Sequence, residues 1–139
     1  MRDWAAKLDM PILSIQYSLT PNAPFPRAIE EIFYVYCWIL KSGKLLGTTG
    51  EKILMVGDSA GANLNSAVVV KCIEMGIPVP HSMLTIYGLF LSNYATMPSR
   101  MLGYVDIFLF YTHLDRIFKA YAGHFKQRQL KRDGRIPEA

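Results

Sequence analysis

One serine of this sequence lies in a setting that suits nucleophilic chemistry. Ser59 is the centre of residues 57–61 (GDSAG), which follow the apolar run 52–56 (KILMV) and open a helical pattern. A Gly-x-Ser-x-Gly turn between a strand and a helix lifts its serine hydroxyl above the carboxyl ends of a sheet. The chemistry expected at such a turn, here called the elbow, is acyl transfer, in which the Ser59 hydroxyl attacks an ester carbonyl.

Each residue of the elbow has a physical reason to be there. The turn is so tight that Ser59 must adopt a strained backbone conformation, and we expect side chains at Gly57 or Gly61 to collide with the neighbouring strand and helix. Asp58 completes the turn, and the amide of Ala60 can help to hold the oxyanion of a tetrahedral intermediate. The alternative is an ordinary glycine-rich turn in which the serine caps the helix. The strand–turn–helix context favours a nucleophile.

An alternation of strands and helices is expected to position the elbow. Apolar runs predict strands over residues 11–17, 52–56 and 83–87, and three-and-four spacing of apolar residues predicts helices over 26–40 and 60–75. The continuous run 52–56 is typical of a parallel strand that is covered on both faces. Strand, helix and strand in sequence require parallel crossovers, so the predicted fold class is α/β, a parallel sheet with flanking helices.

The later part of the chain is less regular. Residues 89–112 are apolar and aromatic, and helical spacing returns over residues 113–122. The stretch from Phe108 to Tyr111 could belong to a lipid-facing lid, but ordinary core packing is favoured, because an isolated apolar run is usually buried.

Composition narrows the class of protein. A chain of 139 residues with 51% hydrophobic residues suits one globular domain. Basic residues concentrate between positions 126 and 135, and we favour a solvated tail over a nucleic-acid or lipid contact, because no aromatic residue is interleaved for base stacking. The first nine residues (MRDWAAKLD) lack the apolar run of a signal peptide, so none is expected, and no apolar run reaches the roughly 18 residues of a membrane span. Cys37 and Cys72 lie in helical patterns and are expected to be buried packing residues.

Several stretches resemble the hormone-sensitive lipase family. Residues 11–28 (PILSIQYSLTPNAPFPRA) resemble the family's D-Y-x-L-A-P-E-x-P-F-P-A segment, and residues 57–64 (GDSAGANL) resemble its G-D-S-A-G-G-N-L elbow. Residues 98–102 (PSRML) and 120–123 (AYAG) are similar to the animal members in particular. The likeness runs at matching spacing, so it is specific.

The resemblance implies a function as well as a fold. It implies a carboxylic ester hydrolase that cleaves lipid esters, such as acylglycerols and cholesterol esters, through an acyl-enzyme on Ser59, without a cofactor or a metal. It also implies a cytoplasmic enzyme that visits lipid droplets, with no nucleic-acid partner. Residues 1–123 would form a partial α/β-hydrolase catalytic domain, and residues 124–139 a basic C-terminal tail.

The chain departs from the family pattern in ways that bear on activity. Gln16 and Asn22 replace an Asp and a Glu, and Ala62 adds a methyl group where the family has Gly. The family's His-Gly-Gly-Gly oxyanion loop lies upstream of the first strand, and its acid and histidine follow later strands; the sequence holds none of them. We therefore expect little or no turnover from this chain alone.

The remaining polar residues are disfavoured as replacements for the missing groups. A triad needs a histidine beside the serine and a carboxylate that orients it, and a surface or helix-end position is favoured for every histidine here. Asn63 and Asn65 are expected to bond loop backbone near the elbow. The groups weighed for a triad are His81, His113 and His124 with Asp106, Asp115 or Asp133.

The sequence leaves two alternatives to an enzyme. One is a non-catalytic ligand-binding member of the fold, like the plant gibberellin receptors, and the other is a truncated gene product.

Overall fold

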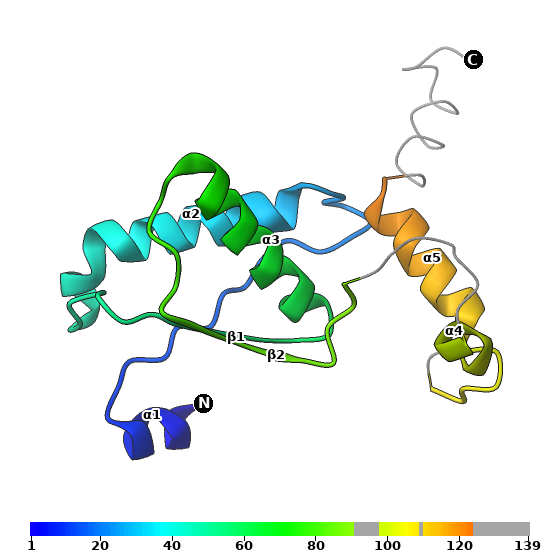
Figure 1. The fold of residues 1–139 in the computed structure, drawn as a ribbon, viewed down its shortest axis with the longest axis horizontal. Helices are drawn as coiled ribbons and strands as arrows, with labels where there is room; N and C mark the ends of the chain where they lie inside the picture. The colour runs from blue at the N-terminus through cyan, green and yellow to red at the C-terminus, as the bar shows by residue number, and fades with distance from the viewer. Residues whose placement is uncertain (91–97, 109, 124–139) are drawn as a thin grey trace, which may run out of the picture. The chain divides into compact units, whose positions relative to one another are not determined.

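A computed structural model gives the fold of the chain and describes residues 1–90, 98–108 and 110–123 (Figure 1). The chain forms two compact units, and each is described by itself: residues 1–17 with 29–90, and residues 18–28 with the described residues beyond 97. The elements are α1 (Arg2–Leu8), α2 (Arg27–Ser42), the short 3-10 helix η1 (Gly43–Leu46), β1 (Leu54–Asp58), α3 (Ala60–Met75), β2 (Ser82–Ile86), α4 (Pro98–Leu102) and α5 (Tyr111–Tyr121).

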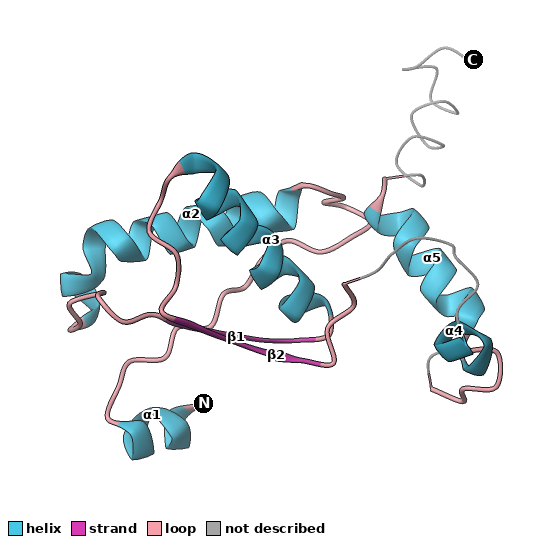
Figure 2. Ribbon diagram, viewed as in Figure 1, coloured by secondary structure: helices cyan, strands magenta, loops and turns pink. Residues whose placement is uncertain are grey.

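The centre of the first unit is a parallel pair of strands joined by a helix (Figure 2). Leu54 of β1 lies opposite Ser82 of β2, and Asp58 lies opposite Ile86. The connecting helix α3 packs against both strands. In Figure 1, α2 and α3 lie on one side of the strands and α1 lies on the other. This strand–helix–strand unit confirms the predicted α/β class.

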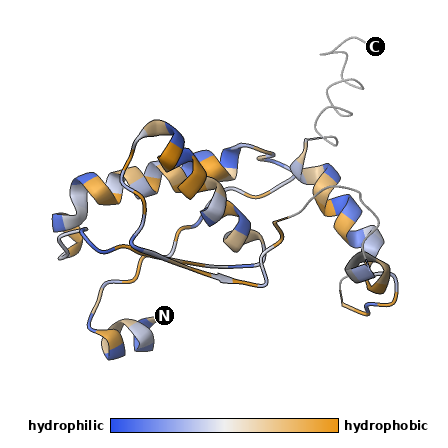
Figure 3. Cartoon of the chain, viewed as in Figure 1, coloured by the Kyte–Doolittle hydropathy of each residue, from blue (hydrophilic) through white to orange (hydrophobic). Residues whose placement is uncertain are grey.

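The core of this unit forms where α2 and α3 face each other and where α3 covers β1. Tyr36 of α2 donates a hydrogen bond of 2.7 Å from its hydroxyl to the carbonyl oxygen of Pro78, and the ammonium of Lys71 lies 5.7 Å from the centre of the Phe33 ring. Figure 3 shows apolar and polar residues alternating along α2, as one buried face requires. The buried apolar residues of this unit are Ile32, Tyr36, Met55, Ala62, Leu64, Val68 and Cys72.

The two cysteines are both free thiols. The prediction that Cys72 is a buried packing residue is confirmed, since its side chain is fully buried in the core. Cys37 is only partly buried. Burial, and then the charge of Cys37, raises the pKa of the Cys72 thiol.

The strand predicted over residues 11–17 is wrong. These residues form no strand, and the apolar side chains of Ile12 and Leu13 are exposed. An apolar run becomes a strand only when a neighbouring strand pairs with its backbone groups. Within the described part of the chain, β1 pairs with β2 alone and no strand accepts this segment.

The prediction that β1 is covered on both faces is also wrong for the described residues. Met55 faces α3 and is buried, whereas the alternate residues Leu54 and Val56 are 53% and 51% exposed. Leu84, which pairs with Val56, is 51% exposed. Successive side chains of a strand point to opposite faces, so one face of the sheet lies under α3 and the other, here called the open face, presents apolar side chains.

The second unit is held together around α5. The N–H of Tyr111 donates to the carbonyl of Gly103 at 3.0 Å, and the rings of Tyr104 and Tyr111 stack with centroids 4.8 Å apart. The N–H of Phe25 donates to the carbonyl of Tyr121 at 2.8 Å, and these two rings meet edge to face. Helix α5 begins two residues before the predicted start at position 113.

The loop before α5 contradicts one expectation. Ile107 and Phe108 are 92% and 96% exposed, so the core packing favoured for the stretch from Phe108 to Tyr111 is wrong at its first residue. These residues form a short turn instead, in which the N–H of Phe108 donates to the Asp106 carboxylate at 2.8 Å. Leu109 and the tail predicted over residues 124–139 lie outside the described residues. Among those described, no helix is long and apolar enough to cross a bilayer.

Candidate active site

Ser59 occupies the turn between β1 and α3, at the carboxyl end of the strand. Its backbone has φ 50° and ψ −115°, so the strained conformation predicted for it is confirmed. The residue stands at the N-cap position of α3, yet its side chain makes no capping hydrogen bond. Because Ser59 is exposed and its side chain does not cap the helix, its hydroxyl is accessible to solvent, and the alternative of a simple helix cap loses its support.

The two glycines of the elbow differ in what they do. A Cβ atom at Gly57 would lie 2.5 Å from the carbonyl carbon of Gly61 and 2.6 Å from its oxygen, which no real side chain tolerates. The collision predicted at Gly61 is wrong, because no described atom beyond its own helix backbone lies within 4 Å of a Cβ built there. A side chain at Gly57 would therefore point at the backbone of Gly61, whereas a side chain at Gly61 would point into open space.

The backbone N–H groups of Ser59 and Ala60 have different roles at the elbow: the first is used in a hydrogen bond of the fold, and the second is a candidate for binding an oxyanion. The N–H of Ser59 donates to the carbonyl of Ile86 at 2.9 Å, so it is used to fasten the turn to β2. Ala60 is the first residue of α3, where an amide has no carbonyl one turn earlier to bond. The position of the Ala60 amide suits an oxyanion donor, and that role stays a prediction.

Side chains of α3 fasten the elbow to the segment that follows β2. Asn63 donates from its side-chain amide to the carbonyl of Leu89 at 2.7 Å, which confirms the predicted backbone-bonding role of Asn63. Asn65 is buried, and its side-chain nitrogen would lie 2.7 Å from a Cβ atom at Gly57. The predicted backbone bond of Asn65 stays a prediction.

Ala62, which replaces a glycine of the resembling family, fits because of the residue it faces. Ala62 is fully buried, and a Cβ atom at Gly88 would lie 2.7 Å from the Ala62 methyl carbon. The missing side chain at Gly88 therefore leaves the space that the methyl group of Ala62 fills. Sequence analysis alone treats Ala62 as an isolated departure, because these two residues are far apart in the chain.

The structure does not bring the weighed histidines to Ser59 within the first unit. His81 directly precedes β2, at the amino end of the sheet, whereas Ser59 follows the carboxyl end of β1. His113 belongs to α5 of the second unit, and His124 and Asp133 lie outside the described residues. Of the weighed carboxylates, Asp106 bonds the Phe108 amide and Asp115 forms an ion pair with Lys119.

One residue beside the elbow is missed by sequence analysis. Tyr87 follows β2, has φ 38°, and donates a hydrogen bond of 3.1 Å from its hydroxyl to Oδ2 of Asp58. That hydrogen bond, and then the charge of Asp58, raises the pKa of the Tyr87 phenol. The signal available in the sequence is that Tyr87 ends the apolar run after the helix, and two parallel strands that end together place such a residue beside the elbow.

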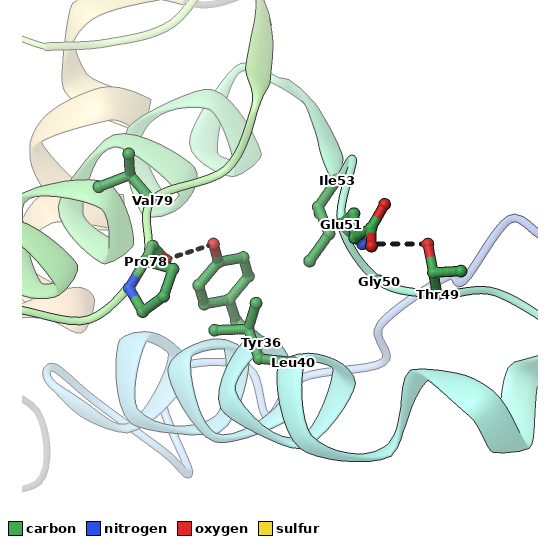
Figure 4. Close-up of a pocket in the computed structure, with 8 residues that line it drawn as sticks. All are labelled: Tyr36, Leu40, Thr49, Gly50, Glu51, Ile53, Pro78 and Val79. Atoms are coloured by element: carbon green, nitrogen blue, oxygen red, sulfur yellow. Dashed lines mark hydrogen bonds between the residues drawn. The ribbon is translucent and has the colours of Figure 1, made fainter.

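A cavity of about 300 Å³ lies at the opposite end of the sheet (Figure 4). The Tyr36 hydroxyl lies beside it and bonds Pro78, and burial raises the pKa of Tyr36 to about 12. Ile53 precedes β1 and Val79 precedes β2, so the cavity is at the amino ends of the strands and is not part of the elbow. Its lining residues are Tyr36, Leu40, Thr49, Gly50, Glu51, Ile53, Pro78 and Val79. Within the described ranges, no cluster of three or more His, Cys, Asp or Glu residues could hold a metal ion.

Comparisons with known sequences identify the fold family of the chain. The sequence model of a family described as the alpha/beta hydrolase fold matches residues 1–132. Human hormone-sensitive lipase is 45% identical over 123 residues, which make up 88% of this chain and 11% of the human protein. Hormone-sensitive lipase of Ictidomys tridecemlineatus is also 45% identical over 123 residues, or 16% of its length. The chain thus spans about a sixth or less of these relatives.

Solved structures agree as well. The structure of DphMB1 matches with a TM-score of 0.77 and 26% identity, over 87% of this chain and 40% of that one. An ester hydrolase, EH1AB1, from the metagenome of Lake Arreo matches with a TM-score of 0.72 and 25% identity, over 91% of this chain and 35% of that one. The chain belongs to the α/β-hydrolase fold family, and the relatives named above show that its sequence is similar to hormone-sensitive lipases.

Proposed function

We propose that Ser59 is the nucleophile of a carboxylic ester hydrolase that acts on lipid esters such as acylglycerols and cholesterol esters. The observation that carries this proposal is the strained backbone of Ser59 together with an exposed hydroxyl that does not cap α3. Strain of this kind persists only where the surrounding structure imposes it, and it gathers at functional sites. The ester class follows from the relatives, which are named as lipases and esterases.

The proposed reaction proceeds through an acyl-enzyme and needs no cofactor. The Oγ of Ser59 attacks the ester carbonyl carbon while a histidine takes its proton; the alcohol leaves with that proton, and water then hydrolyses the acyl-enzyme. The oxyanion would rest on the amide of Ala60 and on amides of a glycine-rich loop. No residue of this chain is assigned as the histidine, its carboxylate or the loop. Without a base the serine hydroxyl is a weak nucleophile, so the 139 residues alone should show little or no turnover.

The decisive experiment is labelling of Ser59 by a fluorophosphonate probe. A longer version of the chain, with the glycine-rich loop and the family histidine, should be labelled at Ser59 and should cleave a short-chain chromogenic ester. Ser59→Ala should abolish both signals. The matched control is Ser66→Ala, because the Ser66 hydroxyl bonds the Ala62 carbonyl within α3 and has no place in the reaction. Absence of labelling in the longer version would remove the esterase assignment, and binding of an ester without labelling would favour a ligand-binding member of the fold.

A second candidate, a product with no independent function, is favoured by the open face of the sheet. Leu54, Val56 and Leu84 present apolar surface there that folded monomers usually bury. Such a chain should bind a dye that reports exposed apolar surface and should associate in solution. A monomer that melts in one cooperative transition would count against this candidate.

We also propose that the enzyme works in the cytoplasm, in lipid degradation, and touches lipid droplets peripherally. The exposed side chains of Ile107 and Phe108 support this contact. These two side chains offer far less area than the about 800 Å² per partner that a stable protein interface buries. Insertion into lipid, by contrast, needs no matching surface. Phe108→Asp should reduce flotation with a phospholipid-coated triacylglycerol emulsion, whereas Leu45→Asp, an exposed leucine of η1, should not. Equal flotation of both variants would rule out this loop.

A further inference from the structure

The carboxyl end of the sheet carries a second strained residue besides Ser59. Tyr87 has φ 38°, a region that bulky side chains rarely adopt. Asp58 and Ile86 are the last register pair of the two strands. Ser59 and Tyr87 therefore occupy matching positions, each one residue beyond the end of its strand. Two strained residues side by side at one sheet end call for a common physical cause.

Two crossed hydrogen bonds join these positions. The N–H of Ser59, which follows β1, donates to the carbonyl of Ile86, the last residue of β2, at 2.9 Å. The hydroxyl of Tyr87, which follows β2, donates to the carboxylate of Asp58, the last residue of β1, at 3.1 Å. Each strand end is thus bonded by the residue that follows the other strand. We call this four-residue arrangement the clasp.

The segment after the clasp is fastened to the elbow as well. Asn63, in the first turns of α3, bonds the carbonyl of Leu89 through its side chain at 2.7 Å. Tyr87 therefore lies between two residues, Ile86 and Leu89, that are both bonded to the elbow or its helix. Such anchoring on both sides can hold an aromatic residue at positive φ.

We infer that Tyr87 is a positioning residue, whose hydroxyl bonds Asp58 and so holds the backbone of Ser59 in its strained conformation. The inference rests on the proposed function, in which Ser59 is the nucleophile. One hydrogen bond from the Ser59 amide leaves the turn free to rotate about that contact. The second hydrogen bond, from the Tyr87 hydroxyl, holds Asp58, the residue before Ser59. A hydrogen bond from a hydroxyl to a carboxylate is stronger than one between two neutral groups. The turn is then held at two points and cannot relax to an ordinary helix cap.

The clasp can be tested in the 139-residue chain without any assay of activity. Tyr87→Phe removes the hydroxyl and keeps the ring, Asp58→Asn keeps an acceptor oxygen and removes the charge, and Tyr34→Phe is the matched control at an exposed tyrosine of α2. Hydrogen exchange of the Ser59 amide should speed up about tenfold in Tyr87→Phe, since a bond to a charged group is lost. Exchange should rise by a smaller factor in Asp58→Asn, which keeps a neutral acceptor for the Tyr87 hydroxyl, and should stay near the wild-type rate in Tyr34→Phe.

A second readout reports the hydrogen bond itself. The pKa of Tyr87, followed by NMR, should be raised in the wild type and should return toward the ordinary tyrosine value in Asp58→Asn, because the charge and the charge-assisted bond are removed. An unchanged pKa of Tyr87 in Asp58→Asn would overturn the clasp even if Tyr87→Phe failed to fold. Exchange that rises equally at the buried Val68 amide would mean general loosening and would also overturn a positioning role.

Failure of the clasp and failure of the proposed function give different results. In the longer version of the chain, Tyr87→Phe should slow fluorophosphonate labelling of Ser59 about tenfold, and Tyr34→Phe should not. Labelling at the wild-type rate in Tyr87→Phe would overturn the positioning role and leave the esterase assignment in place. No labelling of the unmodified longer version would remove the esterase assignment, whatever the exchange rates show.

Discussion

The two ends of the sheet each carry a tyrosine hydroxyl that bonds across the fold, and they use it differently. At the amino end, Tyr36 is 2% exposed and bonds a carbonyl of Pro78. At the carboxyl end, Tyr87 is 75% exposed, has a positive φ, and bonds a carboxylate beside Ser59. A buried hydroxyl bonded to backbone mainly contributes to stability, whereas an exposed and strained one is retained for the geometry that it imposes. The amino end therefore stabilises this unit, and the carboxyl end carries the proposed nucleophile and the residue inferred to position it.

The largest expected effect is at the amino end. Tyr36→Ala should lower the free energy of unfolding by about 3–5 kcal/mol, as the loss of a large buried aromatic side chain does. Tyr34→Ala, at an exposed tyrosine of the same helix, should change it by less than about 0.5 kcal/mol. Urea unfolding followed by circular dichroism measures both. Similar losses in the two variants would contradict the assignment of Tyr36 to the core.

Alanine substitutions at Gly57 and Gly61 should have different effects on stability at the carboxyl end. Gly57→Ala should destabilise the chain by about 1–3 kcal/mol, because the new methyl group meets the Gly61 backbone. Gly61→Ala should be neutral or stabilising by up to about 1 kcal/mol, because alanine favours a helix and has open space there. The same urea titration compares the two. A reversed order would mean that the elbow is not closed as described.

The stability that Tyr36 contributes at the amino end of the sheet should depend on pH. Its folded pKa is raised from 10.0 to about 12, mainly by burial, so its contribution to stability is fully present below pH 10 and is lost as the pH rises from about 10 to 12. The difference in the free energy of unfolding between the wild type and Tyr36→Phe should shrink across this window by on the order of 2 kcal/mol. Unfolding of both proteins at several alkaline pH values tests this. A constant advantage would mean that the phenol is solvated in the folded chain.

The smallest expected effect is a coupling between Ala62 and Gly88. Gly88→Ala places a methyl group against the Ala62 side chain, and Ala62→Gly removes that contact. The cost of Gly88→Ala should therefore fall by about 1 kcal/mol in the Ala62→Gly background. The Phe90 ring also lies close to Gly88, but it is a movable side chain and should turn away in either background. Strictly additive effects in the double-mutant cycle would show that the two positions do not touch.

Prediction from sequence succeeded where the causes are local. The Ser59 turn and the helix after it follow from residues within a few positions of one another, and the α/β class follows from the order of such local elements; the structure agrees with these predictions. It failed for residues 11–17, because a strand needs a partner that local pattern does not supply. It failed for Gly61, because the direction of a Cβ atom depends on the folded path of the turn rather than on the residue type.

The elbow follows from the local sequence: a serine with a glycine two residues away on each side, after an apolar strand, has few backbone conformations open to it, and steric exclusion acts between near neighbours. The distant groups that support this turn cannot be read from the local pattern, because folding alone brings them to it. Tyr87 and Asp58 are 29 positions apart, and Tyr36 and Pro78 are 42 apart. Tyr87 and Asp58 meet because the parallel register places the two strand ends together, and register is a property of the assembled sheet rather than of either segment alone. Tyr36 and Pro78 meet because α2 lies beside the loop between α3 and β2.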